Sequence, residues 1–111
     1  MGANNPLVSG TVSGGSPLKE ISDAAYTVLD SDSGCALRFT NDSAIALTVN
    51  ADVALLGFNF VVVQAGIGQI TFGGTATLRN HDDHTKTAGQ DATVGFICDA
   101  VGELVFSGRT A

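Results

Sequence analysis

The segment from Phe58 to Val63 constrains the fold of this chain more than any other. It reads FNFVVV, so its two phenylalanines would point to one side of a strand, and Val61 and Val63 to the other. A strand that is apolar on both sides is typical of a sheet whose two faces are both covered, usually by helices. The chain has no amphipathic segment of helical length, so we expect its N-terminal arm or another subunit to cover the second face.

Shorter apolar runs with a period of two surround this segment. The clearest are Cys35–Phe39, Ile45–Val49 and Ala92–Asp99, and turn-forming stretches such as Asp30–Gly34 separate them. Two further runs joined by a Gly-Gly pair, residues 73–74, predict a hairpin. Strands this short and this regularly spaced predict an all-β fold, an antiparallel β-sandwich or barrel of about eight strands.

The N-terminal part of the chain differs from the rest. Residues 1–24 are rich in Gly, Ser and Asn and lack a periodic pattern, which predicts an extended arm before a β-sandwich domain of residues 25–111. A disordered tail is the alternative, but isolated apolar residues favour an arm that docks on a partner. These residues are Leu7, Val8, Val12, Leu18 and Ile21. The pattern of a secretory signal is absent from this part of the sequence, and no stretch approaches the ~20 apolar residues of a membrane span.

The charge of the chain argues against nucleic acid as a partner. Five basic residues stand against eleven acidic ones, for a net charge of −6, and the basic residues are scattered. Nucleic-acid binding needs clustered Lys and Arg, so we expect no nucleic-acid partner. Because no stretch is apolar enough for a membrane span, we expect no membrane partner either. Only 14% of the residues are charged, and such a surface suits extensive contact with other proteins.

The two cysteines lie in apolar strand-like runs. Cys35 and Cys98 are too few for a disulfide scaffold, and we interpret them as reduced, buried thiols. A disulfide between neighbouring strands is the alternative.

The residues offer little catalytic chemistry. An enzyme should show a nucleophile beside a base, carboxylates paired in a cleft or a metal set. The sequence offers little of this, so we predict that the chain is not an enzyme and needs no cofactor. One cluster could ligate a metal, namely His81, Asp82, Asp83 and His84. It lies in a polar loop without a rigid element to set its geometry, so a solvated loop is our interpretation and metal binding the alternative.

Several short motifs follow one another from residue 58 onwards. They are Q-x-G-x-G, T-F, L-R-N, K-T-x-G-Q and a final F-S-G, formed by Gln64, Gly66, Gly68, Thr71, Phe72, Leu78, Arg79, Asn80, Lys86, Thr87, Gly89, Gln90, Phe106, Ser107 and Gly108. In order and spacing they resemble a β-rich module of tailed-bacteriophage virion proteins, and Tyr26–Val28 matches its opening strand. The resemblance covers Ala25–Ala111. It departs at Arg109, where an acidic residue is common, and at Val105, where an aromatic residue often stands.

The resemblance implies a structural part of a virion. Because the sequence begins with Met and has no heptads or shaft repeats, we expect a free-standing capsid decoration (cement) protein rather than a tail fibre. The alternative is a tail fibre or tailspike receptor-binding module or a tail structural module. A receptor-binding tip needs aromatic platforms in its loops, whereas this chain has no Trp and one Tyr.

A decoration protein implies particular partners and a particular location. The chain would be made in the bacterial cytoplasm and would bind the outer surface of the expanded head, where it stabilises the capsid. Its expected partners are the major capsid protein, contacted by the apolar residues of the arm, and further copies of itself in a homotrimer. We expect Val61 and Val63 to form the subunit interface.

Overall fold

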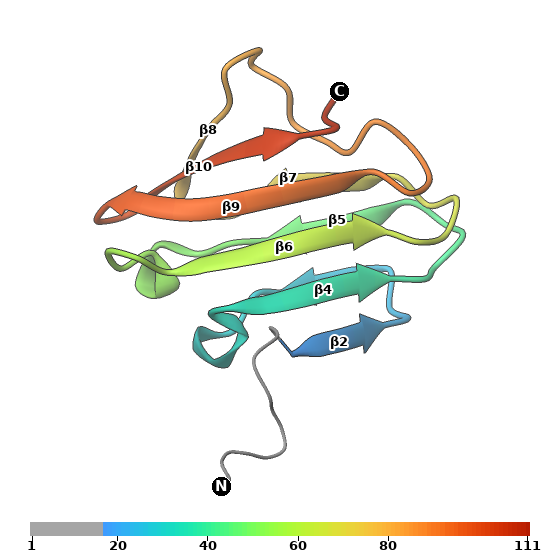
Figure 1. Ribbon diagram of the computed structural model, residues 1–111, viewed down its shortest axis with the longest axis horizontal. Helices are drawn as coiled ribbons and strands as arrows, with labels where there is room; N and C mark the ends of the chain where they lie inside the picture. Colours follow the sequence, from blue (N-terminus) through green and yellow to red (C-terminus); the bar gives the residue numbers. More distant parts are fainter. Residues whose placement is uncertain (1–16) are drawn as a thin grey trace, which may run out of the picture.

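The computed structural model describes residues 17–111, which form two facing β-sheets (Figure 1). The six-stranded sheet contains, in spatial order, β2 (Leu18–Ile21), β4 (Cys35–Phe39), β6 (Asn59–Gln64), β9 (Thr93–Ala100), β10 (Glu103–Gly108) and β8 (Thr77–Arg79). The three-stranded sheet contains β3 (Ala25–Thr27), β5 (Ile45–Thr48) and β7 (Ile70–Gly73). Two single-turn 3-10 helices, η1 (Asp30–Asp32) and η2 (Ala51–Val53), lie in the connections. None of the helices within residues 17–111 has the length and apolar character needed to cross a bilayer.

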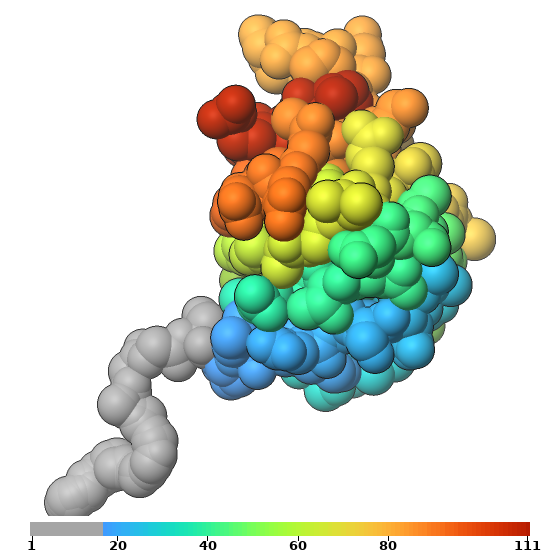
Figure 2. Space-filling view, turned by 90° about the vertical axis from the view of Figure 1, so that its right-hand side faces the viewer, coloured from blue at the N-terminus to red at the C-terminus, as the bar shows by residue number. Residues whose placement is uncertain are grey.

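The chain alternates between the two sheets from β2 to β7. Strands β2, β4 and β6 pair in parallel in one sheet, and β3, β5 and β7 pair in parallel in the other. Each full turn of the chain, which we call a coil, therefore adds one strand to each sheet. The coils stack in sequence order, as the view from one end shows (Figure 2). The result is a solenoid-like arrangement.

The last strands close the larger sheet differently. β9 pairs antiparallel with β6, β10 pairs antiparallel with β9, and β8 pairs in parallel with β10. The all-β class is thus confirmed. The prediction of antiparallel pairing is wrong for most strand pairs, and the mixed sheets do not form a clear sandwich or barrel. Parallel strands normally need a helical crossover, but here strands of the opposite sheet make the crossovers.

The hairpin predicted at Gly73-Gly74 is also wrong. The runs on either side of the pair belong to different sheets, since β7 lies in the smaller sheet and β8 in the larger one. Gly74 has φ +120°, and a Cβ on it would overlap the backbone carbonyl of Val49. The glycines therefore let the chain pass close to a neighbouring coil instead of reversing it within one sheet.

Alternate residues of both sheets build one core between them. Leu37 and Phe39 on β4 are fully buried, and so are Phe60 on β6 and Phe96 on β9, as the period of two predicts. The ring of Phe96 stacks on Phe60 at 4.6 Å between centroids and meets the edge of Phe72 from the smaller sheet at 5.0 Å. These aromatic contacts fix the spacing of the two sheets.

Part of the expected arm belongs to this fold. Residues 18–21 form β2, and Ile21 packs in the core with 5% of its surface exposed. Residues 1–16 lie outside the described part of the chain.

Candidate interaction surfaces

One face of the six-stranded sheet packs on the smaller sheet, and no element within residues 17–111 lies over the other (Figure 1). We call this uncovered side the outer face. Val61 stands at its centre with 37% of its surface exposed, between Ala36 on β4 and Gly95 on β9. Ile97, which follows on β9, is 49% exposed. Val61 and Ile97 therefore stand exposed beside the small residues Ala36 and Gly95, and we call these four residues the apolar strip.

Charged pairs stand at both ends of this strip. Arg38 contacts Glu20 at 3.0 Å on one side. On the other side, Arg79 pairs with Asp99 and, at 3.2 Å, with Glu103. All five side chains are exposed, and such pairs contribute about 0–1 kcal/mol each to stability. They flank the apolar strip without holding the fold together.

The residues predicted as contacts fall into three groups. Val61 and Val63 lie on the outer face, exposed and half-buried respectively. Leu18 is 61% exposed on the edge strand β2, so its side chain is free to meet a partner, whereas the burial of Ile21 makes it a core residue that no partner can reach. The remaining three, Leu7, Val8 and Val12, lie outside the described residues.

A second apolar surface was not predicted. Leu55, Leu56 and Val101 are 60%, 69% and 67% exposed, and we call them the apolar end patch. They occupy two turns at the end of the molecule where β6 begins and β9 ends. A Gly102 N–H···O=C Ala54 bond of 2.8 Å joins the two turns. The signal in the sequence is a large apolar residue directly before a turn glycine, in Leu56-Gly57 and in Val101-Gly102.

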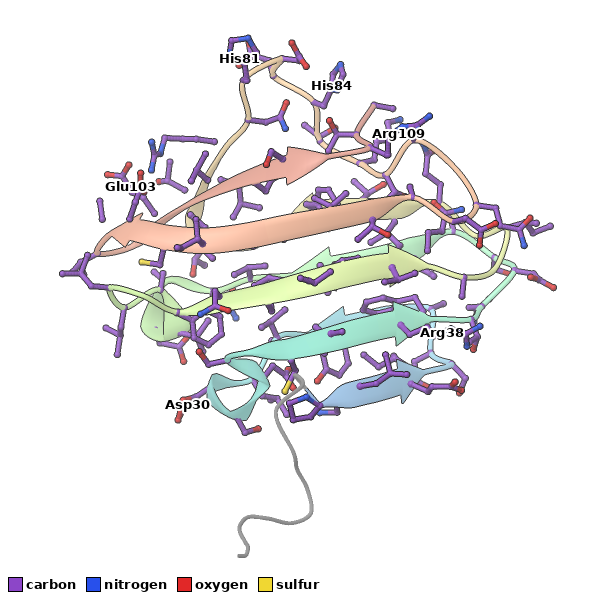
Figure 3. All side chains as sticks on the ribbon, in the orientation of Figure 1. Asp30, Arg38, His81, His84, Glu103 and Arg109 are labelled. Atoms are coloured by element: carbon purple, nitrogen blue, oxygen red, sulfur yellow. The ribbon has the colours of Figure 1, made fainter. Side chains whose placement is uncertain are left out.

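Residues 81–84, which we call the histidine loop, follow β8 and project from the β8 edge of the larger sheet (Figure 3). The side-chain oxygen of Asn80 accepts hydrogen bonds from the backbone N–H groups of Asp82 at 3.0 Å and His84 at 3.1 Å. The His84 ring contacts the Thr110 hydroxyl at 2.9 Å, while His81 is exposed. Within residues 17–111, no three His, Cys, Asp or Glu side chains are grouped so that they could hold a metal ion.

Both cysteines are free thiols. Cys98 is buried, and its Sγ lies 3.1 Å from the carbonyl oxygen of Ala100. Cys35 is only partly buried, so the prediction of a buried thiol holds for Cys98 alone.

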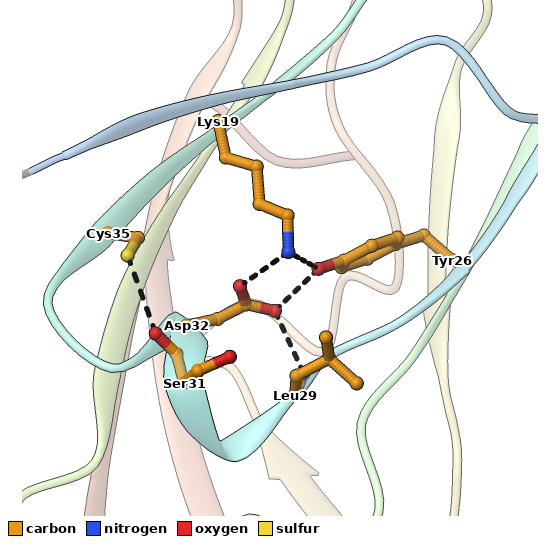
Figure 4. A network of polar contacts seen from close by, with 6 residues as sticks. All are labelled: Lys19, Tyr26, Leu29, Ser31, Asp32 and Cys35. Atoms are coloured by element: carbon orange, nitrogen blue, oxygen red, sulfur yellow. Dashed lines mark hydrogen bonds and ion pairs between the residues drawn. The ribbon is translucent and has the colours of Figure 1, made fainter.

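A polar network that the sequence did not predict lies beside the edge strand β2 (Figure 4). The Asp32 carboxylate is 1% exposed. It accepts hydrogen bonds from Tyr26 at 2.7 Å, the Leu29 N–H at 2.8 Å and Lys19 at 3.2 Å. Burial by itself raises the pKa of Asp32, but these three donors outweigh it, so the pKa lies below its ordinary value of 3.8. The network ties the edge strand β2 to β3 and η1.

The motif residues behind the resemblance form a second internal network. Gln64 and Thr87 are buried, and the Thr87 hydroxyl donates to the Gln64 side-chain oxygen while it accepts the Ile70 N–H at 3.0 Å. Gln90 donates to the Ala65 carbonyl at 3.1 Å. A Cβ on Gly68 would overlap the Ser43 carbonyl of the preceding coil. These residues hold the turns between coils, which gives the motifs that contain them a structural role.

Comparison of the sequence with protein-family models gives no match, and comparison with curated proteins gives none either. The resemblance to phage virion modules therefore rests on its motif residues.

Proposed function

We propose that this chain is a non-enzymatic bacteriophage head decoration protein. It binds the outer surface of the expanded head as a homotrimer and stabilises the shell through subunit and arm contacts. The observation that carries the proposal is the uncovered outer face, on which Val61 and Ile97 are exposed beside the small residues Ala36 and Gly95. A sheet face with exposed apolar residues between charged pairs fits contact with another protein surface.

The energetic basis of the proposal is burial of apolar surface. Covering the outer face removes apolar area from water at about 25 cal/mol per Å². A protein that binds only the expanded shell stabilises that state by mass action, and a trimer that contacts several capsid subunits multiplies weak contacts. The net charge of −6 fits a position outside the shell, away from packaged DNA.

The described residues sharpen the proposed role of the arm. Leu18 remains available for contact at the edge of the sheet, whereas Ile21 serves the core. In the proposal, the capsid-binding arm therefore consists of residues 1–16, which contain Leu7, Val8 and Val12, together with Leu18.

Binding to heads tests the proposal directly. Purified chain is mixed with expanded and unexpanded heads that lack it, and the bound fraction is measured by co-sedimentation. We expect binding to expanded heads only, a trimer by light scattering, and loss of both in Val61→Asp. The control is Thr71→Asp, an exposed residue on a strand of the smaller sheet, which should behave as wild type. A wild-type chain that remains monomeric and ignores both kinds of head would contradict the proposal.

A tail fibre, tailspike or tail structural module is the second candidate function. A hollow of about 230 Å³ favours it, because Gln90, Asp91 and Arg109 line it and can form hydrogen bonds with glycan hydroxyl groups. Binding of purified chain to host-cell glycans, lost in Arg109→Ala, is the result expected for this candidate.

A further inference from the structure

Hydrogen bonds hold the backbone beneath the apolar end patch. The Leu55 carbonyl accepts the Phe58 N–H at 2.9 Å, and the Gly57 N–H donates to the Cys98 carbonyl at 3.0 Å. Gly57 has φ +87° and Gly102 has φ +81°, which fixes the shape of both turns. Turn tips are usually polar, yet these carry Leu56 and Val101. Backbone held in this way loses little freedom on binding.

The rim of the patch is acidic. Asp52 precedes it in η2, and Asp99 and Glu103 flank the Val101 turn. The one basic group among these neighbours is Arg79, which already pairs with Asp99 and Glu103. Figure 3 shows Asp30 and Glu103 at this end of the molecule and Arg38 and Arg109 at the other.

We infer that the apolar end patch inserts into an apolar pocket on the capsid shell protein whose rim carries Lys or Arg. This inference rests on the proposed function and names the contact that positions the chain on the shell. A second copy does not fit the patch in a patch-to-patch contact, because two acidic rims would then face each other. The area argues the same way, since three such side chains expose roughly 300 Å², against about 800 Å² per partner in a stable complex. A small contact of this kind suits a shell that offers it in many copies.

Head binding with matched variants tests the inference. Leu56→Asp places a charge in the proposed pocket, and we expect about 10-fold or greater weakening of binding to expanded heads. The control is Ile67→Asp at the far end of the molecule, because Ile67 is 66% exposed and thus closely matches Leu56. Neither variant should shift the melting temperature or the oligomeric state. The association rate of the wild type should fall as salt rises, because the rims attract each other.

The outcomes separate this inference from the proposed function. If wild type and Leu56→Asp bind heads equally well, the inference alone is overturned. A photo-crosslinker at position 56 that captures a second copy also overturns only the inference. An association rate that does not change with salt would contradict the proposed Lys or Arg on the rim of the pocket. Failure of the wild type to bind heads at all overturns the inference and the proposed function together.

Discussion

At the scale of single residues, buried polar groups decide how the two sheets are joined. The Asp32 carboxylate collects three donors from β2, β3 and the residue before η1, and it covers the end of the core next to Tyr26. Desolvation penalises the carboxylate, and its donors more than compensate, so the folded state holds it ionised. An inward-pointing Lys19 on an edge strand also discourages pairing with a stray strand.

The lowered pKa of Asp32 predicts a pH dependence of stability. A carboxyl group whose pKa is lower in the folded state stabilises the protein above its unfolded pKa of about 3.8, and this contribution is lost as pH falls below that value. Asp32→Asn should therefore cost about 2 kcal/mol of unfolding free energy at pH 7, and the difference from wild type should shrink toward pH 2. Urea unfolding at each pH measures it.

The control for this prediction is Asp30→Asn, since Asp30 is an exposed neighbour in the same helix. It should leave the unfolding free energy unchanged at pH 7. A constant difference between wild type and Asp32→Asn from pH 7 to pH 2 would show that the carboxylate charge is not what stabilises the network.

The Gln64–Thr87 pair predicts a second effect at this scale. Thr87→Val keeps the shape of the side chain but leaves the Gln64 side-chain oxygen and the Ile70 N–H without the hydroxyl. We expect a loss of about 2–3 kcal/mol in unfolding free energy. Thr85→Val, two residues earlier and exposed, should be nearly neutral in the same assay. Equal stability of the two variants would show that the buried hydroxyl is dispensable.

At the scale of elements, the period of two located the strands but not their directions. Phe58–Val63 has the two faces that its residues predict, with Phe60 buried and Val61 exposed. Alternation is the same in parallel and antiparallel strands, so the sequence could not reveal the coils. The Asp32 network escaped prediction for a related reason, because its members meet only when β2 lies beside β4.

The position of β2 at the sheet edge predicts how far the N-terminus can be deleted before the fold loses stability. Deletion of residues 2–16 should leave the melting temperature within a few degrees of wild type, because the Lys19 contacts and the buried Ile21 remain. Deletion of residues 2–21 removes both and uncovers the Phe39 side of the core, so a large drop in melting temperature is expected. Differential scanning calorimetry distinguishes the two deletions. Equal melting temperatures for the two deletions would mean that β2 adds nothing to the fold.

At the scale of the whole molecule, the sequence predicted a strand that is apolar on both sides but did not predict the apolar end patch. Val61 and Val63 follow from a strand that is apolar on both sides. Leu55, Leu56 and Val101 stand in turns, where periodicity carries no information, and only the backbone bonds between the turns bring them together. The described part of the chain thus offers two apolar surfaces, a sheet face proposed for its own copies and an end proposed for the shell.

Electron cryomicroscopy of virions that contain this chain tests the account most directly. We predict trimeric density for the two-sheet fold on the outer surface of the expanded head, with Val61 at the subunit contact and Leu56 against the shell. Density for the chain at the tail, or a head surface without it, would contradict the account.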